Sequence, residues 1–106
     1  PFTLKKEKAT PSPSATAARG VAVSIAAELK SRFGAKKVAL FGSLARVEFD
    51  RWSDIDLVAW GIPAADFYRA VAFATGFSGD WRVDLVDAED CSPSLRAVLE
   101  REGVEL

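Results

Sequence analysis

The order of apolar and polar residues predicts a chain in which helices and short strands alternate. Short apolar runs are typical of strands, while apolar residues that recur every three or four positions are typical of helices. Strands are expected over residues 38–41, 54–60 and 81–86, with a short edge strand over 104–106. Helices are expected over 17–33, 63–75 and 93–102, with a brief helical turn over 44–47. This alternation predicts a layered α/β domain with three or four strands.

Residues that favour helix ends mark the limits of these helices. Thr16 is the expected N-cap of the first helix, and Gly34 is its expected stop because glycine tolerates the left-handed conformation that closes a helix. Pro63 suits the first turn of the second helix, where a missing N–H costs no hydrogen bond. Either Ser92 or Ser94 could cap the last helix.

The N-terminal residues differ in composition from the rest of the chain. Residues 1–17 are polar, their Thr10-Pro11-Ser12-Pro13 stretch disfavours helix, and they have little apolar surface to bury. We therefore expect a flexible arm over residues 1–17, ordered by binding to another molecule, and one domain over residues 18–106.

Composition excludes several kinds of chemistry. The 106 residues carry 14 Lys and Arg against 15 Asp and Glu, a net charge of −1, so no direct nucleic-acid partner is expected. With no histidine and the single cysteine Cys91, the chain cannot use Ser-His-Asp or Cys-His catalysis, His-ligated zinc or an internal disulfide. No apolar run reaches the ~20 residues that span a bilayer. The N-terminus does not resemble a signal peptide, so a cytoplasmic protein without membrane contact is expected.

Three aspartates on two of the expected strands suggest a metal site. Asp54 and Asp56 lie two residues apart, so both side chains project from one face of a strand, with Cα atoms roughly 6.5–7 Å apart. Asp84 lies in the next strand and reaches the same place if the two strands are neighbours. Close carboxylates repel one another, and a hard divalent cation removes that repulsion. We therefore interpret Asp54, Asp56 and Asp84 as a site for two Mg²⁺ ions.

A glycine and a serine between the first strand and the helical turn suggest a phosphate site beside this cluster. Gly42 allows backbone amides to approach a phosphate, Ser43 adds a hydroxyl donor, and Arg46 adds a positive charge. A phosphate cradle beside a two-metal carboxylate site suits nucleotidyl transfer. In that reaction Asp84 would hold one metal and accept the proton of the incoming hydroxyl.

These residues resemble the signature of the DNA polymerase β-like nucleotidyltransferase superfamily. Gly42-Ser43, ten further residues and Asp54-Ile55-Asp56 match the pattern G-S-x10-D-x-D, and the stretches LFGSLAR and SDIDL are similar to those of minimal nucleotidyltransferase (MNT) domains. The resemblance covers about residues 18–106. It implies a small mixed β-sheet of three to four strands with helices packed mainly on one face. It also implies catalytic and metal-binding roles for Asp54, Asp56 and Asp84, and nucleotide-binding roles for Gly42, Ser43 and Arg46.

The resemblance further implies an activity and a partner. Small members of this family are often encoded beside an α-helical HEPN-domain protein, as antitoxin to its toxin, and some transfer AMP from ATP to that partner. The chain is therefore expected to be a Mg²⁺-dependent protein adenylyltransferase that uses ATP. Since the chain ends soon after its third strand, the acceptor hydroxyl is expected to arrive on the HEPN protein. Val47 stands where the family commonly has glycine, so the loop after Arg46 is expected to differ.

Several alternatives stay open. The domain could neutralise a partner by binding alone with an inactive nucleotide site, or it could bind a nucleotide without turnover, and a homo-oligomer is compatible with the sequence. Asp84 could form an ion pair with Arg82, and Arg46 could be only a surface charge. Trp60, on the same side of its strand as the aspartates, could stack on a base, or it could pack in the core or at an interface.

Overall fold

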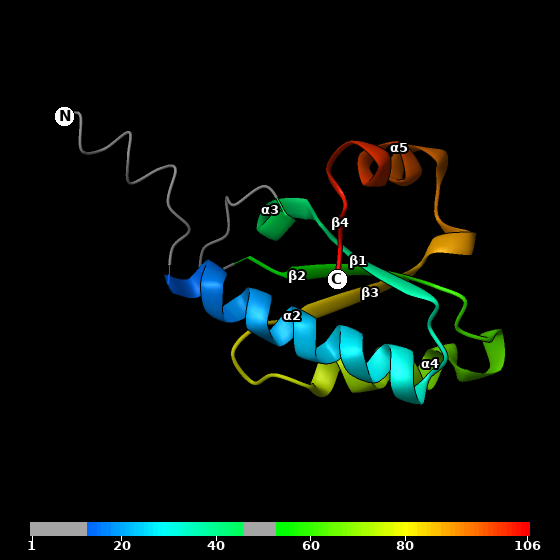
Figure 1. The fold of residues 1–106 in the computed structure, drawn as a ribbon, viewed down its shortest axis with the longest axis horizontal. Helices are drawn as coiled ribbons and strands as arrows, with labels where there is room; N and C mark the ends of the chain where they lie inside the picture. The colour runs from blue at the N-terminus through cyan, green and yellow to red at the C-terminus, as the bar shows by residue number, and fades with distance from the viewer. Residues whose placement is uncertain (1–12, 46–52) are drawn as a thin grey trace.

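The computed structural model describes residues 13–45 and 53–106, in which helices and strands alternate as expected (Figure 1). The elements in chain order are α2 (Pro13–Arg32), β1 (Lys37–Phe41), α3 (Gly42–Ala45), β2 (Ile55–Trp60), α4 (Ala64–Gly76), β3 (Val83–Asp87), the 3₁₀ turn η1 (Ala88–Asp90), α5 (Pro93–Glu102) and β4 (Val104–Glu105). In these two ranges, no helix combines the length and the apolar character needed to cross a membrane.

The four strands form one mixed sheet in the order β3-β2-β1-β4. Strand β1 pairs antiparallel with both β2 and β4, whereas β2 and β3 are parallel. Parallel neighbours need a long crossover, and α4 supplies it between β2 and β3. The expected fold class, a small mixed sheet with helices mainly on one face, is confirmed.

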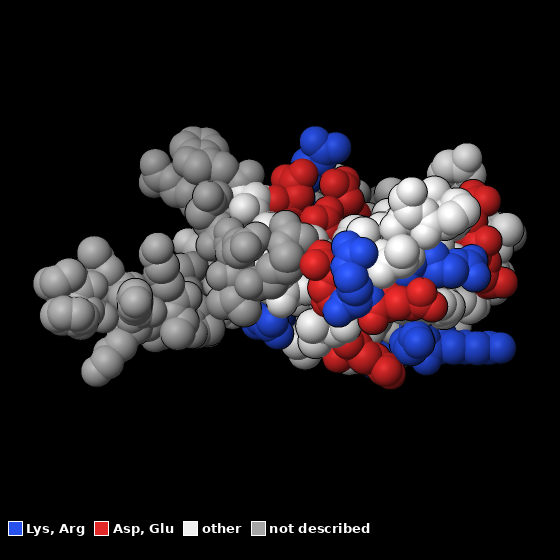
Figure 2. Space-filling model, turned by 90° about the horizontal axis from the view of Figure 1, so that it is seen from above, with Lys and Arg blue, Asp and Glu red and all other residues white. Residues whose placement is uncertain are grey.

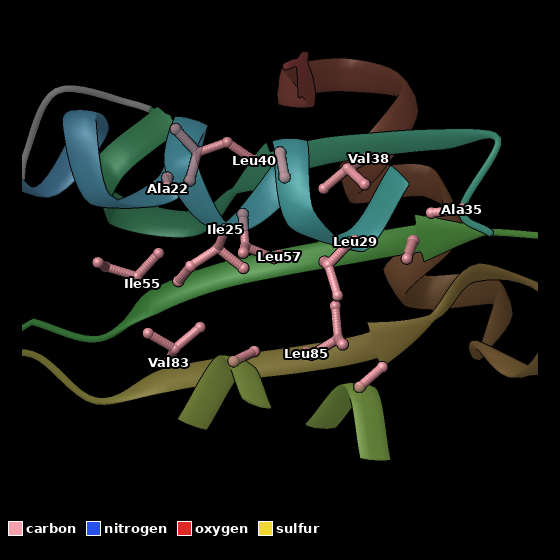
Figure 3. Close-up of a cluster of buried hydrophobic side chains, with 14 of the residues drawn as sticks. Ala22, Ile25, Leu29, Ala35, Val38, Leu40, Ile55, Leu57, Val83 and Leu85 are labelled. Carbon is pink, nitrogen blue, oxygen red and sulfur yellow. The ribbon is translucent and has the colours of Figure 1, made fainter. Parts of the chain in front are cut away.

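Helices α2 and α4 cover one face of the sheet and enclose the main core (Figures 1 and 3). Alternate strand residues point toward these helices because strand side chains alternate between the two faces. Leu29 of α2, Leu40 of β1 and Leu57 of β2 are all fully buried there. The small residues of α2, such as Ala22 and Ala26, allow this helix to lie close to the sheet.

The other face of the sheet is covered more lightly, by η1 and α5. Within the described ranges, its core cluster has three buried members, Ala39, Val58 and Ala88, with Phe41, Trp60 and Leu99 partly buried beside them. Among the described residues of α5, none is buried. The described part of this face therefore has a much smaller apolar core than the face covered by α2 and α4.

Helix α2 begins earlier than the sequence predicts. It starts at Pro13, so Thr16 lies within the helix and is not its N-cap, and residues 13–17 are helical instead of part of an arm. Proline is favoured at the first helical position, where its fixed φ fits and its missing N–H needs no partner. Residues 1–12 of the expected arm lie outside the described residues, so the flexible arm stays a prediction.

The C-terminal end of α2 agrees with the prediction. Gly34 has a φ of +79°, and the N–H of Ala35 donates to the carbonyl oxygen of Leu29 at 3.0 Å. The same Leu29 oxygen also accepts from the N–H of Phe33 at 3.2 Å, and the left-handed glycine turns the chain back over the last turn of the helix. The chain thus leaves the helix and turns directly into β1 at Lys37.

The remaining boundaries differ from the prediction by one or two residues. Strand β2 begins at Ile55 instead of at 54, and β3 spans Val83–Asp87 instead of 81–86. The helical turn expected over 44–47 is α3, which begins directly at Gly42. The short turn η1 was not predicted. Helix α5 and the short edge strand β4 are present where they were expected.

The structure selects Ser92 as the N-cap of α5. Its hydroxyl oxygen accepts a hydrogen bond from the N–H of Leu95 at 3.1 Å. We expect Ser92→Ala to lower the free energy of unfolding by about 1 kcal/mol, because the cap satisfies a backbone donor that the helix leaves open. Ser94→Ala is the matched control, because Ser94 lies inside α5 and is exposed. Its free energy of unfolding, measured in urea, should be within about 0.5 kcal/mol of the wild-type value. Equal midpoints for the two variants would contradict this assignment.

Candidate active site

The three predicted aspartates lie at one end of the lightly covered face. Asp56 and Asp84 are direct partners in the parallel pairing of β2 with β3. Asp54 precedes β2 by one residue, and alternation places it on the same face as Asp56. The backbone therefore brings together the carboxylates that the sequence predicted to be neighbours.

Gly42 directly follows β1 and lies beside Asp56 at this end of the sheet. Phe41 pairs with Asp56 across the antiparallel strands, so the next residue, Gly42, lies against that aspartate. A Cβ built on Gly42 would collide with Oδ2 of Asp56 and lie 3.2 Å from its Cγ. The φ of Gly42 is +74°, a conformation that other residues adopt at a cost. Both the space and the backbone conformation at this corner thus require glycine.

Ser43 and Leu44 follow Gly42 in α3. Leu44 is fully buried in the main core and fixes this short helix to the domain. Ser43 is half-buried at the same corner. Arg46 and Val47 lie outside the described residues, so the expected role of Arg46 with a nucleotide and the expected change in the loop stay predictions.

Asp84 forms an ion pair with Arg82. The guanidinium Nε lies 3.6 Å from the Asp84 Oδ1, and both side chains are accessible, at 72% and 43% exposure. Arg82 lies just before β3, and its carbonyl oxygen accepts a hydrogen bond from the N–H of Ile55 at 2.9 Å. The structure therefore contains the ion pair between Asp84 and Arg82 that was left open as an alternative.

The aspartates fit a hard divalent cation in their chemistry, and their strand positions are adjacent. Carboxylate oxygens are the ligands that Mg²⁺ prefers, and Asp56 and Asp84 lie on strands whose backbones are about 4.8 Å apart. Within residues 13–45 and 53–106, no three acidic, histidine or cysteine side chains are already gathered as a metal site. The backbone thus places Asp56 and Asp84 side by side, while the side chain of Asp84 is directed toward Arg82.

Comparison with known proteins identifies the family. The nucleotidyltransferase domain family matches residues 23–102. The chain belongs to this family. No curated protein matches the chain. A solved structure assigned as a minimal nucleotidyltransferase is 33% identical, with a TM-score of 0.69 over 87% of this chain and 95% of that one.

Two more distant solved structures share the fold of this nucleotidyltransferase domain. One is a toxin–antitoxin complex with AMP-PNP, at 20% identity and a TM-score of 0.63 over 81% of this chain and 69% of that one. The other is a tri-AMPylated HEPN toxin of Shewanella oneidensis in complex with an MNT antitoxin, at 17% identity and a TM-score of 0.58. That match covers 86% of this chain and 70% of the other.

Trp60 lies on the same face of the nucleotidyltransferase domain but at the opposite end of β2. Its ring packs beside the second core cluster, with the Lys37 Nζ 4.2 Å from the ring centroid. A groove of about 490 Å³ between α5 and the sheet is lined by Trp60, Leu99, Arg96 and neighbouring residues, but by none of the three aspartates. Trp60 is thus half-buried, packed against the apolar cluster of this face on one side and lining the groove on the other.

Two residues of the site were not among the predicted functional residues. Phe41 pairs with Asp56 and shares its face, and Arg82 contacts Asp84. Arg82 lies two residues before Asp84, so strand alternation predicts that both share a face. The sequence indicates Arg82 only as a possible ion-pair partner of Asp84. On the side of the molecule that carries α3 and α5, acidic and basic side chains are intermixed (Figure 2).

Proposed function

We propose that this domain is a Mg²⁺-dependent adenylyltransferase that transfers AMP from ATP to a hydroxyl of a HEPN-domain partner, and that it serves as the antitoxin of that pair. The main support is the direct pairing of Asp56 with Asp84 beside Gly42, in a chain that belongs to the nucleotidyltransferase family. Asp54, Asp56 and Asp84 are the proposed catalytic and metal-binding residues. Gly42, Ser43 and Arg46 are the proposed nucleotide-binding residues.

The reaction requires a hydroxyl oxygen to attack the α-phosphorus of ATP. The new P–O bond forms as the bond to the β-phosphate oxygen breaks, and pyrophosphate leaves. When bound, two Mg²⁺ ions would neutralise the triphosphate and lower the pKa of the attacking hydroxyl. Asp54 and Asp56 would hold the metals, Asp84 would hold the one nearest the hydroxyl and accept its proton, and Gly42 and Ser43 would position the phosphates.

The choice of partner rests on the solved structures with the same fold. One of them is a toxin–antitoxin complex with AMP-PNP, and another contains a tri-AMPylated HEPN toxin with its MNT antitoxin. The side chain of Asp84 is also 43% exposed, so it is accessible from solvent. These observations support a protein hydroxyl on a HEPN partner as the acceptor.

The test is transfer of label to a HEPN-domain protein encoded beside this chain. With Mg²⁺, label from α-labelled ATP should appear on the partner, and label from γ-labelled ATP should not, because pyrophosphate leaves. Removal of the metal with EDTA should stop the transfer, and added Mg²⁺ should restore it. Absence of α-label on the partner, measured by gel and by the mass of an added AMP, would contradict the proposal.

A second measurement separates catalysis from binding. Toxicity of the partner should return when the antitoxin carries the double substitution Asp54→Ala and Asp56→Ala, while the two proteins still form a complex by size-exclusion chromatography. If the double variant neutralises the partner as well as wild type does, the domain acts by complex formation alone. That result would replace the enzyme by the binding-module alternative.

A further inference from the structure

Among residues 13–45 and 53–106, Arg82 is a cation that lies beside the carboxylates of the candidate site. Asp56 and Asp84 pair directly, and the hydrogen bond from Ile55 to the Arg82 carbonyl extends the strand pairing by one residue. Arg82 is therefore beside Asp54 in the sheet, and its contact with Asp84 shows that its side chain lies on the face of the aspartates. The guanidinium thus shares a surface with three acidic residues.

The contact between Arg82 and Asp84 is weak enough for Arg82 to leave Asp84 when another anion binds. At 3.6 Å, the separation of Nε and Oδ1 is too long for a hydrogen bond. Both side chains are accessible to water, and exposed ion pairs of this kind contribute little to stability. The backbone of Arg82 is fixed by the 2.9 Å hydrogen bond from Ile55, so only its side chain has to move.

We infer that Arg82 is a resident counter-ion that holds Asp84 before the nucleotide binds and then moves to the phosphates of the nucleotide. Arg82 would be a positioning residue for Asp84 and a binding residue for the substrate. This inference rests on the proposed function, because it assumes that metal and nucleotide bind at these aspartates.

The charges at the site explain why the binding of metal and the binding of nucleotide would depend on each other. Of the groups that the structure describes, the three carboxylates and the Arg82 guanidinium together carry a net charge of −2, which a single divalent ion balances. A second ion is favourable only when the triphosphate adds its own negative charge. A guanidinium released from Asp84 would meet that triphosphate, and its planar group suits phosphate oxygens. Metal alone should therefore bind weakly, and metal with nucleotide should bind together.

The test measures the two ligands separately in Arg82→Gln. Mn²⁺ alone, titrated by electron paramagnetic resonance, should bind about threefold more tightly to the variant than to wild type, because its competitor for Asp84 is gone. The complex of Mn²⁺ with the non-hydrolysable analogue AMP-PNP, measured by calorimetry, should bind about tenfold more weakly, because a charged hydrogen bond to phosphate is lost. Arg82→Lys should restore the weak binding of Mn²⁺ alone.

The matched control is Arg69→Gln. Arg69 pairs with Asp66 on α4, and its side chain has the same 72% exposure as that of Arg82. Both affinities should stay at the wild-type values in this control. If wild type binds Mn²⁺ with AMP-PNP and Arg82→Gln has the same two affinities as wild type, the inference is overturned and the proposed function stays intact. Failure of wild type to bind Mn²⁺ with AMP-PNP would overturn both.

Discussion

Asp56→Asn should reduce AMP transfer by at least roughly a hundredfold, because it removes a charge from the centre of the proposed site. Asp56 pairs with Asp84 on one side and with Phe41 on the other, and it lies against Gly42. An amide keeps nearly the same shape but binds Mg²⁺ much more weakly than a carboxylate does. The loss should therefore be seen in the rate of transfer and in the affinity for Mn²⁺ with AMP-PNP.

The same variant should remain folded. Asp56 is only half-buried, and Asn preserves its volume, so its melting temperature in the absence of metal should be close to that of wild type. Asp80→Asn provides the control: it removes one charge from an exposed turn before β3 and should leave transfer unchanged. Transfer by Asp56→Asn within a factor of three of wild type would show that the carboxylate has no part in catalysis.

The sequence predicts the strand face on which each aspartate lies, because side chains alternate between the two faces of a strand. Asp54 and Asp56 are separated by one buried residue, Ile55, so their common face follows from periodicity alone. The parallel pairing of β2 with β3 is favoured once a helix is expected between them. Pattern and connection length thus allow Asp84 to be a neighbour of Asp56, and the pairing of β2 with β3 makes it one.

Side-chain directions could not be predicted in the same way. The spacing of Arg82 and Asp84 allows an ion pair, but the sequence gives no reason for Asp84 to choose Arg82 over the other aspartates. The early start of α2 was missed because proline was interpreted as a helix breaker, although its effect depends on its position within the helix. Both outcomes depend on local geometry that residue spacing does not encode.

Gly42→Ala should damage the site as strongly as the loss of a carboxylate, although it changes no charge. An added Cβ would collide with Oδ2 of Asp56, and a φ of +74° costs alanine about 1–2 kcal/mol. We expect the free energy of unfolding to fall by about 1–3 kcal/mol. Binding of Mn²⁺ with AMP-PNP should weaken at least tenfold, because Asp56 must move away from the metal position.

A matched glycine isolates this effect. Gly20 lies within α2 with nothing within 4 Å of a Cβ built on it, so Gly20→Ala should stabilise the protein by about 0.5–1 kcal/mol and leave binding unchanged. A double-mutant cycle with Asp56→Ala then separates strain from contact. Without the carboxylate, Gly42→Ala should cost less stability than it does in wild type, since the colliding atoms are gone and only the backbone strain remains. An equal cost in both backgrounds would mean that Gly42 does not act through Asp56.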